Sequence, residues 1–293
     1  MRWSTLVKPL LALSLTANAG PLLAAAATAP TTTASAATAP ATPAQQALTA
    51  SPVDDIVAQY PAMMSQGIRD GLVQNAQVPE MVADTLGRMI SANVKAEDIN
   101  RRIVDNLDQN LTDAQLDAVK QWYDTPLAGR IAKAEIAASA PAAWPTIQSQ
   151  AAALNKKYQG TERARLFDRF DRASRATESA VDTAIALQLS LSSALSALRG
   201  EPVTPEQTRS TLEAQRPALR GVVGQQVYDT YLYTYQSFSN QELGLYLAFL
   251  ESDAGSAFTR EVTGSIQQAI TEPVTELGKQ MSRMLTPGLS SGN

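Results

Sequence analysis

Three groups of side chains in this sequence could do chemistry, and the first is a run of tyrosines. The segment VYDTYLYTYQSF, residues 227–238, spaces Tyr228, Tyr231 and Tyr235 so that a helix would carry them on one face. A tyrosine offers an apolar ring and a hydroxyl group, which together can line a ligand groove or stack on a sugar. The simpler interpretation is packing against the core with the hydroxyls in water. A short strand, from the alternation that includes Tyr233, is a further alternative. The three tyrosines are our candidate ligand-binding face.

The second group is the arginine-rich segment TERARLFDRFDRASR, residues 161–175. On a helix, Arg165, Arg169 and Arg172 would share a face and could bind phosphate or an anionic lipid headgroup. Two aspartates in the segment each stand four residues before an arginine, which favours ion pairs on a solvated helix face: Asp168 with Arg172, and Asp171 with Arg175. We therefore predict a solvent-facing helix here and no anion site.

The third group is the carboxylates, which can cleave glycans when two are held a fixed distance apart. Here they are scattered singly on polar helix faces, near helix starts, where they compensate the helix dipole. The chain has no cysteine and no histidine, so it lacks a thiolate nucleophile, the usual neutral-pH base and the commonest transition-metal ligands. No phosphate-binding loop, nucleophile elbow or EF-hand spacing occurs. The sequence thus predicts no catalytic residue, no cofactor and no metal site, and a protein that is not an enzyme.

The N-terminus is typical of an export signal, which we assign to residues 1–26. Arg2 and Lys8 precede an uncharged stretch, PLLALSLTANAGPLLAAAA, with small-residue cleavage options at 17–19 and 24–27. That stretch is short and interrupted for a membrane-spanning helix, which needs about 20 apolar residues. We predict a periplasmic protein that is not transmembrane after cleavage.

Composition limits the partners. Loss of the signal removes two positive charges from a chain whose formal charge is −4, and an acidic protein repels nucleic acid.

Residues 27–50 are almost wholly Ala, Thr, Pro and Ser, so we predict a disordered linker. The folded part should divide into a first helical repeat, 51–160, and a long helix with a second repeat, 161–293.

The two repeats are suggested by a pattern that the chain writes twice, LTDAQLDAVKQWYDTPLAG at 111–129 and FSNQELGLYLAFLESDAG at 238–255. Each copy begins with a capping box and a hydrophobic staple, continues with an apolar stripe that ends in aromatic residues, and then starts a new helix before a glycine. The residues of this structural motif are Thr112, Gln115, Trp122, Tyr123, Pro126 and Gly129, then Ser239, Glu242, Phe249 and Gly255. Because glycine inside a helix costs about 1 kcal/mol against alanine, we expect another helix to approach each glycine closely.

The pattern resembles an uncharacterised bacterial family known as domain of unknown function 2059, whose proteins combine a signal peptide with a helical body and a "[ST]-x-x-E-L … F-Y-x-S-P-x-G" segment. The first copy departs from it at Gln115, and the second at Leu250 and Asp253. The resemblance implies no activity, since the matching positions are caps, core and close-packing residues.

We therefore expect an all-α protein built from two related helical repeats. A long helix over 161–199 would join them, and each repeat would end in a long helical segment with an internal proline, Pro145 or Pro273. The function we favour is a non-enzymatic interaction or binding module of the bacterial envelope, whose partner is a protein or an apolar ligand. One alternative is a carrier of lipid or another hydrophobic ligand, with a cavity near Tyr228, Tyr231 and Met64. A carboxylate-dependent envelope hydrolase is the less favoured alternative. The sequence does not fix the oligomeric state.

Overall fold

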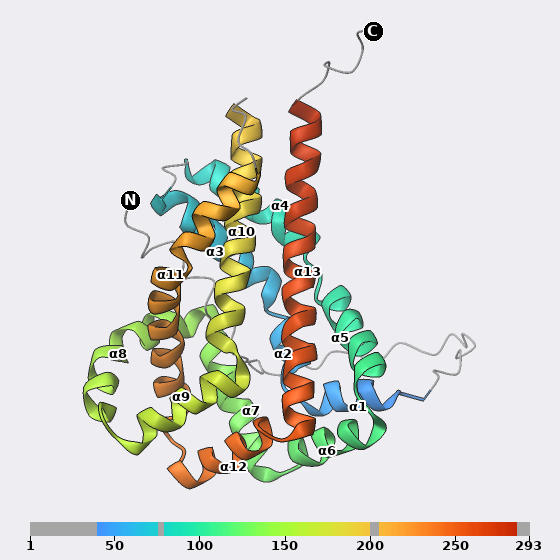
Figure 1. The fold of residues 1–293 in the computed structure, drawn as a ribbon, viewed down its shortest axis with the longest axis vertical. Helices are drawn as coiled ribbons and strands as arrows, with labels where there is room; N and C mark the ends of the chain where they lie inside the picture. The colour runs from blue at the N-terminus through green and yellow to red at the C-terminus, as the bar shows by residue number, and fades with distance from the viewer. Residues whose placement is uncertain (1–39, 76–78, 200–204, 286–293) are drawn as a thin grey trace, which may run out of the picture.

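The computed structural model describes residues 40–75, 79–199 and 205–285, and each regular element in these ranges is a helix (Figure 1). This confirms the all-α prediction. The predicted signal peptide, and the predicted linker up to residue 39, lie outside the described residues. In chain order the elements are α1 (Pro43–Ala50), α2 (Val53–Val57), α3 (Tyr60–Asn75), α4 (Glu80–Asn93), α5 (Ala96–Asn110), α6 (Asp113–Tyr123), α7 (Pro126–Ser139), the 3-10 turn η2 (Pro141–Ala143), α8 (Trp144–Tyr158), α9 (Glu162–Ser174), α10 (Ala176–Arg199), α11 (Pro205–Thr234), α12 (Asn240–Leu250) and α13 (Asp253–Leu285).

Three long helices form the middle of the molecule. α10 lies between α11 and α13, α5 packs on another side of α13, and α8 packs on α11 (Figure 1). Residues 183–198 of α10 carry no charged side chain, and Thr183, Ala184, Ile185 and Leu187 among them are buried. Within the described ranges no helix combines the length and apolar content needed to cross a membrane.

The short helices close the lower end of the molecule. α6 and α12, which carry the two copies of the repeated pattern, meet through the Trp122 indole, which stacks on Tyr246 and Phe249 with ring centroids 5.8 and 4.9 Å away. α9 packs on α12, and α1 packs on α5 and α6. One hydrophobic cluster therefore includes residues from both halves of the chain.

The cap signals of both copies form as the sequence predicts. The side chains of Thr112 and Ser239 accept hydrogen bonds from the backbone N–H groups three residues on. In return, the side chains of Gln115 and Glu242 accept hydrogen bonds from the backbone N–H groups of Thr112 and Ser239. The second caps form as well, with Thr125 accepting from Ala128 and Ser252 accepting from Gly255. These bonds confirm the local structure, while the duplication remains a prediction.

The surroundings of the two motif glycines differ. The expectation that another helix approaches closely is wrong at Gly129. A Cβ atom at Gly129 would meet nothing within 4 Å. At Gly255 it would lie 2.0 Å from the carbonyl oxygen of Phe249. The neighbour there is the last turn of α12, the helix just before it in the chain, so the constraint is local to the α12–α13 corner.

Two predicted long helices are broken. The helix expected over 161–199 divides at Arg175, which has a left-handed backbone with φ of 54° and ends α9. The Asp171 carboxylate accepts from the N–H of Thr177 at 2.9 Å and so caps the start of α10. The helix expected to contain Pro145 divides at η2, and this proline stands in the first turn of α8, where its missing N–H costs nothing.

The compositional linker also ends earlier than expected. Thr42 and Gln45 form a capping box that starts α1, and Ala44, Ala47 and Leu48 are buried. The small side chains of this helix allow it to pack closely on α5 and α6. Composition alone predicts disorder here because it does not include this packing.

Candidate functional site

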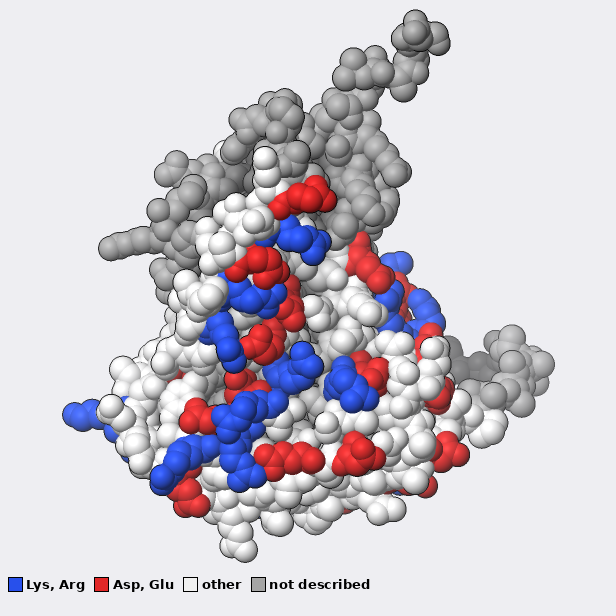
Figure 2. Space-filling model, in the orientation of Figure 1, with Lys and Arg blue, Asp and Glu red and all other residues white. Residues whose placement is uncertain are grey.

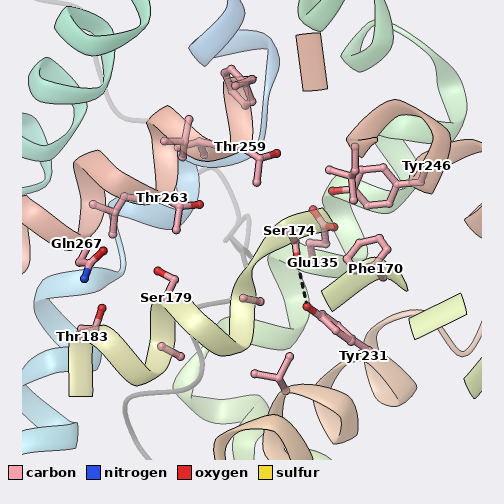
Figure 3. A pocket seen from close by; sticks show the side chains of 18 of the residues that line it. Glu135, Phe170, Ser174, Ser179, Thr183, Tyr231, Tyr246, Thr259, Thr263 and Gln267 are labelled. Atoms are coloured by element: carbon pink, nitrogen blue, oxygen red, sulfur yellow. Dashed lines mark hydrogen bonds between the residues drawn. The ribbon is translucent and has the colours of Figure 1, made fainter. Parts of the chain in front are cut away.

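A cavity of about 140 Å³ lies among α7, α9, α10, α11, α12 and α13 (Figure 3). Its lining is mostly apolar and includes the rings of Phe170, Tyr231, Tyr235 and Tyr246. The residues come from helices far apart in the chain, so only the complete fold assembles this space.

Glu135, on α7, is the acidic side chain of the lining and is only 3% exposed. The Tyr235 hydroxyl donates to its Oε1 at 2.5 Å, whereas its Oε2 has no hydrogen-bond partner. The Tyr246 hydroxyl faces this carboxyl and favours its ionised form without reaching hydrogen-bonding geometry to Oε2 (Figure 3). Burial outweighs both hydroxyls and raises the pKa of Glu135 to about 7.

Aromatic rings surround this carboxyl. The Phe170 ring lies 5.1 to 5.3 Å, centroid to centroid, from the rings of Tyr231, Tyr235 and Tyr246. Burial raises the pKa of each of these three tyrosines well above its ordinary value, and the negative charge of Glu135 adds to the effect. The tyrosines therefore stay neutral at physiological pH and act as hydrogen-bond donors and apolar walls.

Hydroxyl groups occupy the other part of the lining. Figure 3 shows Ser179 and Thr183 of α10 facing Thr263 and Gln267 of α13, away from the group formed by Glu135 and the aromatic rings. The hydroxyls of Ser174 and Tyr231 are 3.1 Å apart and link α9 to α11. The cavity thus combines apolar walls with one carboxyl and several neutral polar groups, as ligand sites commonly do.

A second, more open hollow of about 540 Å³ lies between α9, α10 and α11. It is lined by Asp168, Arg172, Arg220 and Tyr228 among others, and Figure 2 shows acidic and basic side chains interleaved over this face. Arg220 pairs with Glu178 of α10 at 2.7 Å. Opposite charges in contact with one another give this hollow no net preference for an anion.

The arginine-rich segment is only partly as predicted. The expected pairs of Asp168 and Asp171 with arginines four residues on are not among the ion pairs of the described residues. Arg169 pairs instead with Glu251, the residue that follows α12, at 2.7 Å. Arg163 is buried and donates to the carbonyl oxygens of Tyr235 and Phe238. That arginine fixes the turn between α11 and α12, and so helps to position Tyr235 over Glu135.

The candidate tyrosine face is divided between the two hollows. Tyr231 and Tyr235 are buried and line the smaller cavity, whereas Tyr228 lines the larger hollow, and Tyr231 borders that hollow too. Met64 is buried in the hydrophobic cluster and is not part of either lining. The segment that carries the tyrosines is helical through Thr234, so the strand alternative is wrong.

Glu135 is the site residue that the sequence analysis missed. Ala128, Ile131, Glu135 and Ala138 are all buried on α7 and recur at spacings of three and four. An acid inside an apolar stripe was therefore the available signal, because a solvated carboxylate belongs on the opposite face. Among the described residues, Glu135 is the carboxylate of this lining, whereas a glycosidase uses two such groups. Across the described ranges, no group of three or more acidic side chains is placed to hold a metal ion.

The fold and the cavity define a class, an all-helical protein with a small, mainly apolar internal site. Residues 97–157 match the family DUF2059, described as "Uncharacterized protein conserved in bacteria". The matched segment runs from α5 to α8 and includes both the first copy of the repeated pattern and Glu135. No curated protein and no solved structure matches the chain.

Proposed function

We propose that this protein is a non-enzymatic binding module of the bacterial envelope that holds a small, mainly apolar molecule in the cavity beside Glu135. The cavity itself carries the proposal. Its walls are apolar and aromatic, and its few polar groups, Glu135, Ser174 and Thr183 among them, are placed to orient a ligand.

The size of the cavity limits which ligands a carrier of this kind could hold. A dry cavity of about 150 Å³ in another protein holds benzene. At about 140 Å³ this cavity suits a ligand of similar bulk, and an intact lipid would not fit inside it. We therefore favour a small aromatic or short-chain ligand over a membrane lipid.

An adaptor for another protein has less support. Contiguous exposed apolar patches of several hundred Å² mark such surfaces. Among the residues whose side chains are described, the large apolar ones that are exposed are Met81, at 79%, and Leu245, at 53%. They stand on α4 and α12, at opposite ends of the molecule (Figure 1), and so do not form one patch.

Two further parts of the proposal rest on the sequence and on its local structure. The basic and then apolar N-terminal segment, 1–26, supports export to the periplasm through a cleaved signal. The matching cap bonds of α6 and α12 support an origin of Ser239–Gly255 as a second, degenerate copy of the family segment. In this reading the repeated pattern contributes shape, since its two aromatic ends, Trp122 and Phe249, stack on each other beside the cavity.

Native mass spectrometry of the mature protein, purified gently from the periplasm of an expressing cell, tests the binding function. We expect a mass above that of the polypeptide which is lost on collisional activation. A bare polypeptide, together with no thermal stabilisation by small aromatic compounds, would contradict the proposal, because any ligand that binds only the folded state raises its stability.

A further inference from the structure

The cavity contains a buried acid that is incompletely partnered. Glu135 receives one hydrogen bond, from the Tyr235 hydroxyl, and its Oε2 has none. Among the described residues it forms no ion pair, since Arg130 on the same helix pairs with Glu242 at 2.8 Å and the buried Arg163 donates to backbone carbonyls. Removing one carboxylate from water without a counter-charge costs several kcal/mol. A positively charged group beside Oε2 would offset this cost, and the described residues do not supply one.

We propose that the ligand of this cavity is a small organic cation, an aromatic or short-chain alkyl ammonium, whose charged group binds Glu135 at Oε2. This inference rests on the proposed binding function and specifies its ligand.

The surroundings of Glu135 fit an ammonium better than a neutral polar group. Phe170, Tyr231, Tyr235 and Tyr246 border the same space, and aromatic faces attract cations in addition to offering apolar contact. An alkyl or aryl ammonium would place its charge at the carboxyl and its apolar part against these walls. The acidic chain, with a formal charge of −4, also favours the approach of a cation.

The groups that face Glu135 from the neighbouring helices do not compete for this role. They are the hydroxyls of Tyr123 on α6, Tyr231 on α11, Tyr235 in the turn after α11, and Tyr246 on α12. Each has its pKa raised by burial and by the charge of Glu135. Tyr60 on α3, which also lines the cavity, is neutral for the same reason of burial. Near neutral pH, Glu135 is therefore the group of this site that changes its charge.

Calorimetry with two matched probes, benzylamine and benzyl alcohol, tests the inference on the full mature chain. The probes share bulk and differ in charge. At about pH 8, where the amine is protonated and Glu135 is ionised, we expect benzylamine to bind more tightly than benzyl alcohol. Its affinity should fall about tenfold for each pH unit below about 7, whereas that of benzyl alcohol should stay constant.

Glu135→Gln provides the matched variant, because the amide keeps an acceptor for the Tyr235 hydroxyl and loses only the charge. We expect it to bind benzylamine about tenfold to a hundredfold more weakly, and benzyl alcohol unchanged. Glu251→Gln, which removes a carboxylate from the surface pair with Arg169, should bind both probes as the parent does.

The outcomes separate this inference from the proposed function. Equal binding of both probes, in the parent and in Glu135→Gln, would overturn the cationic ligand and leave a cavity that binds neutral molecules. Binding of benzyl alcohol alone would do the same. Binding of neither probe to the parent would overturn both the inference and the small-ligand function.

Discussion

At the scale of single residues, Glu135 is where the requirements of folding and binding conflict. An apolar side chain would complete the stripe of α7, and the carboxyl instead lies 3% exposed beside aromatic rings. Stability alone does not explain such a residue, because an unpaired buried acid weakens the fold. The conflict is the reason to connect Glu135 with a ligand.

Glu135 should make stability depend on pH in a specific window. Its folded pKa, about 7, is above its ordinary value of 4.5, so the folded state holds the proton more tightly than the unfolded chain. The stability it contributes is therefore complete below about pH 4.5 and is lost as the pH rises through about 7. Near pH 4.5, we expect Glu135→Gln and the parent to have the same free energy of unfolding. Above about pH 7, the free energy of unfolding of Glu135→Gln should be higher than that of the parent by about 3 kcal/mol.

Urea unfolding at several pH values, without added ligand, checks this expectation. Glu242 does not interfere, because hydrogen bonds from Ser239 and Arg130 lower its pKa to about 2, and its effect appears only at more acidic pH. Glu251→Gln serves as the control and should keep the pH profile of the parent. A constant difference between Glu135→Gln and the parent across the window would show that Glu135 keeps an ordinary pKa in the folded protein.

The two motif glycines make a second prediction at this scale. Gly129→Ala places a methyl group in open space within a helix, so we expect it to raise the free energy of unfolding by up to about 1 kcal/mol. Gly255→Ala places one against the Phe249 carbonyl oxygen, and the clash with backbone should cost about 1–3 kcal/mol. Thermal unfolding of the two variants measures both effects. Stabilisation by both substitutions would show that the α12–α13 corner adjusts freely.

At the scale of helices, the sequence predicts starts better than interruptions. The caps at Thr112, Thr125, Ser239 and Ser252 could be predicted because each depends on bonds within four residues. The break at Arg175 could not, since arginine has no preference for a left-handed backbone, and the break depends on the packing of α9 on α12 and of α10 on α11 and α13. The start of α1 is the reverse case, because its local signal, the Thr42 cap, lies in an alanine-rich stretch whose composition predicts disorder.

The α9–α10 break predicts opposite effects for two substitutions of one exposed residue. Arg175→Gly should raise the free energy of unfolding by about 0.5–1 kcal/mol, because glycine adopts a φ of 54° without steric cost. Arg175→Val should lower it by about 1 kcal/mol, since a branched Cβ is strained in that conformation. Chemical denaturation of both variants decides the point, and destabilisation by glycine would mean that the break owes its conformation to contacts of the arginine side chain.

At the scale of the whole molecule, the cavity is a property that no single segment contains. Glu135 comes from the segment that matches the bacterial family, Phe170 from α9, Tyr231 from α11 and Thr263 from α13. Their meeting depends on how α10 sits between α11 and α13, which follows from packing and not from local pattern. The sequence could therefore indicate Tyr231 and Tyr235 as candidates, but it could not show what they enclose.

The proposed export of the chain is also a property of the molecule as a whole. If residues 1–26 are a cleaved signal, the protein recovered from the periplasm should begin near residue 27 and have lost the charges of Arg2 and Lys8. Replacing two leucines of the apolar stretch, as Leu11→Arg with Leu13→Arg, should hold the full-length chain in the cytoplasm, because export signals require an uncharged apolar core. Cell fractionation with intact-mass measurement distinguishes the two products. The conservative change of the same leucines to isoleucine should leave export unaltered, and a full-length parent chain confined to the cytoplasm would contradict the envelope location while leaving the binding site open to the same probes.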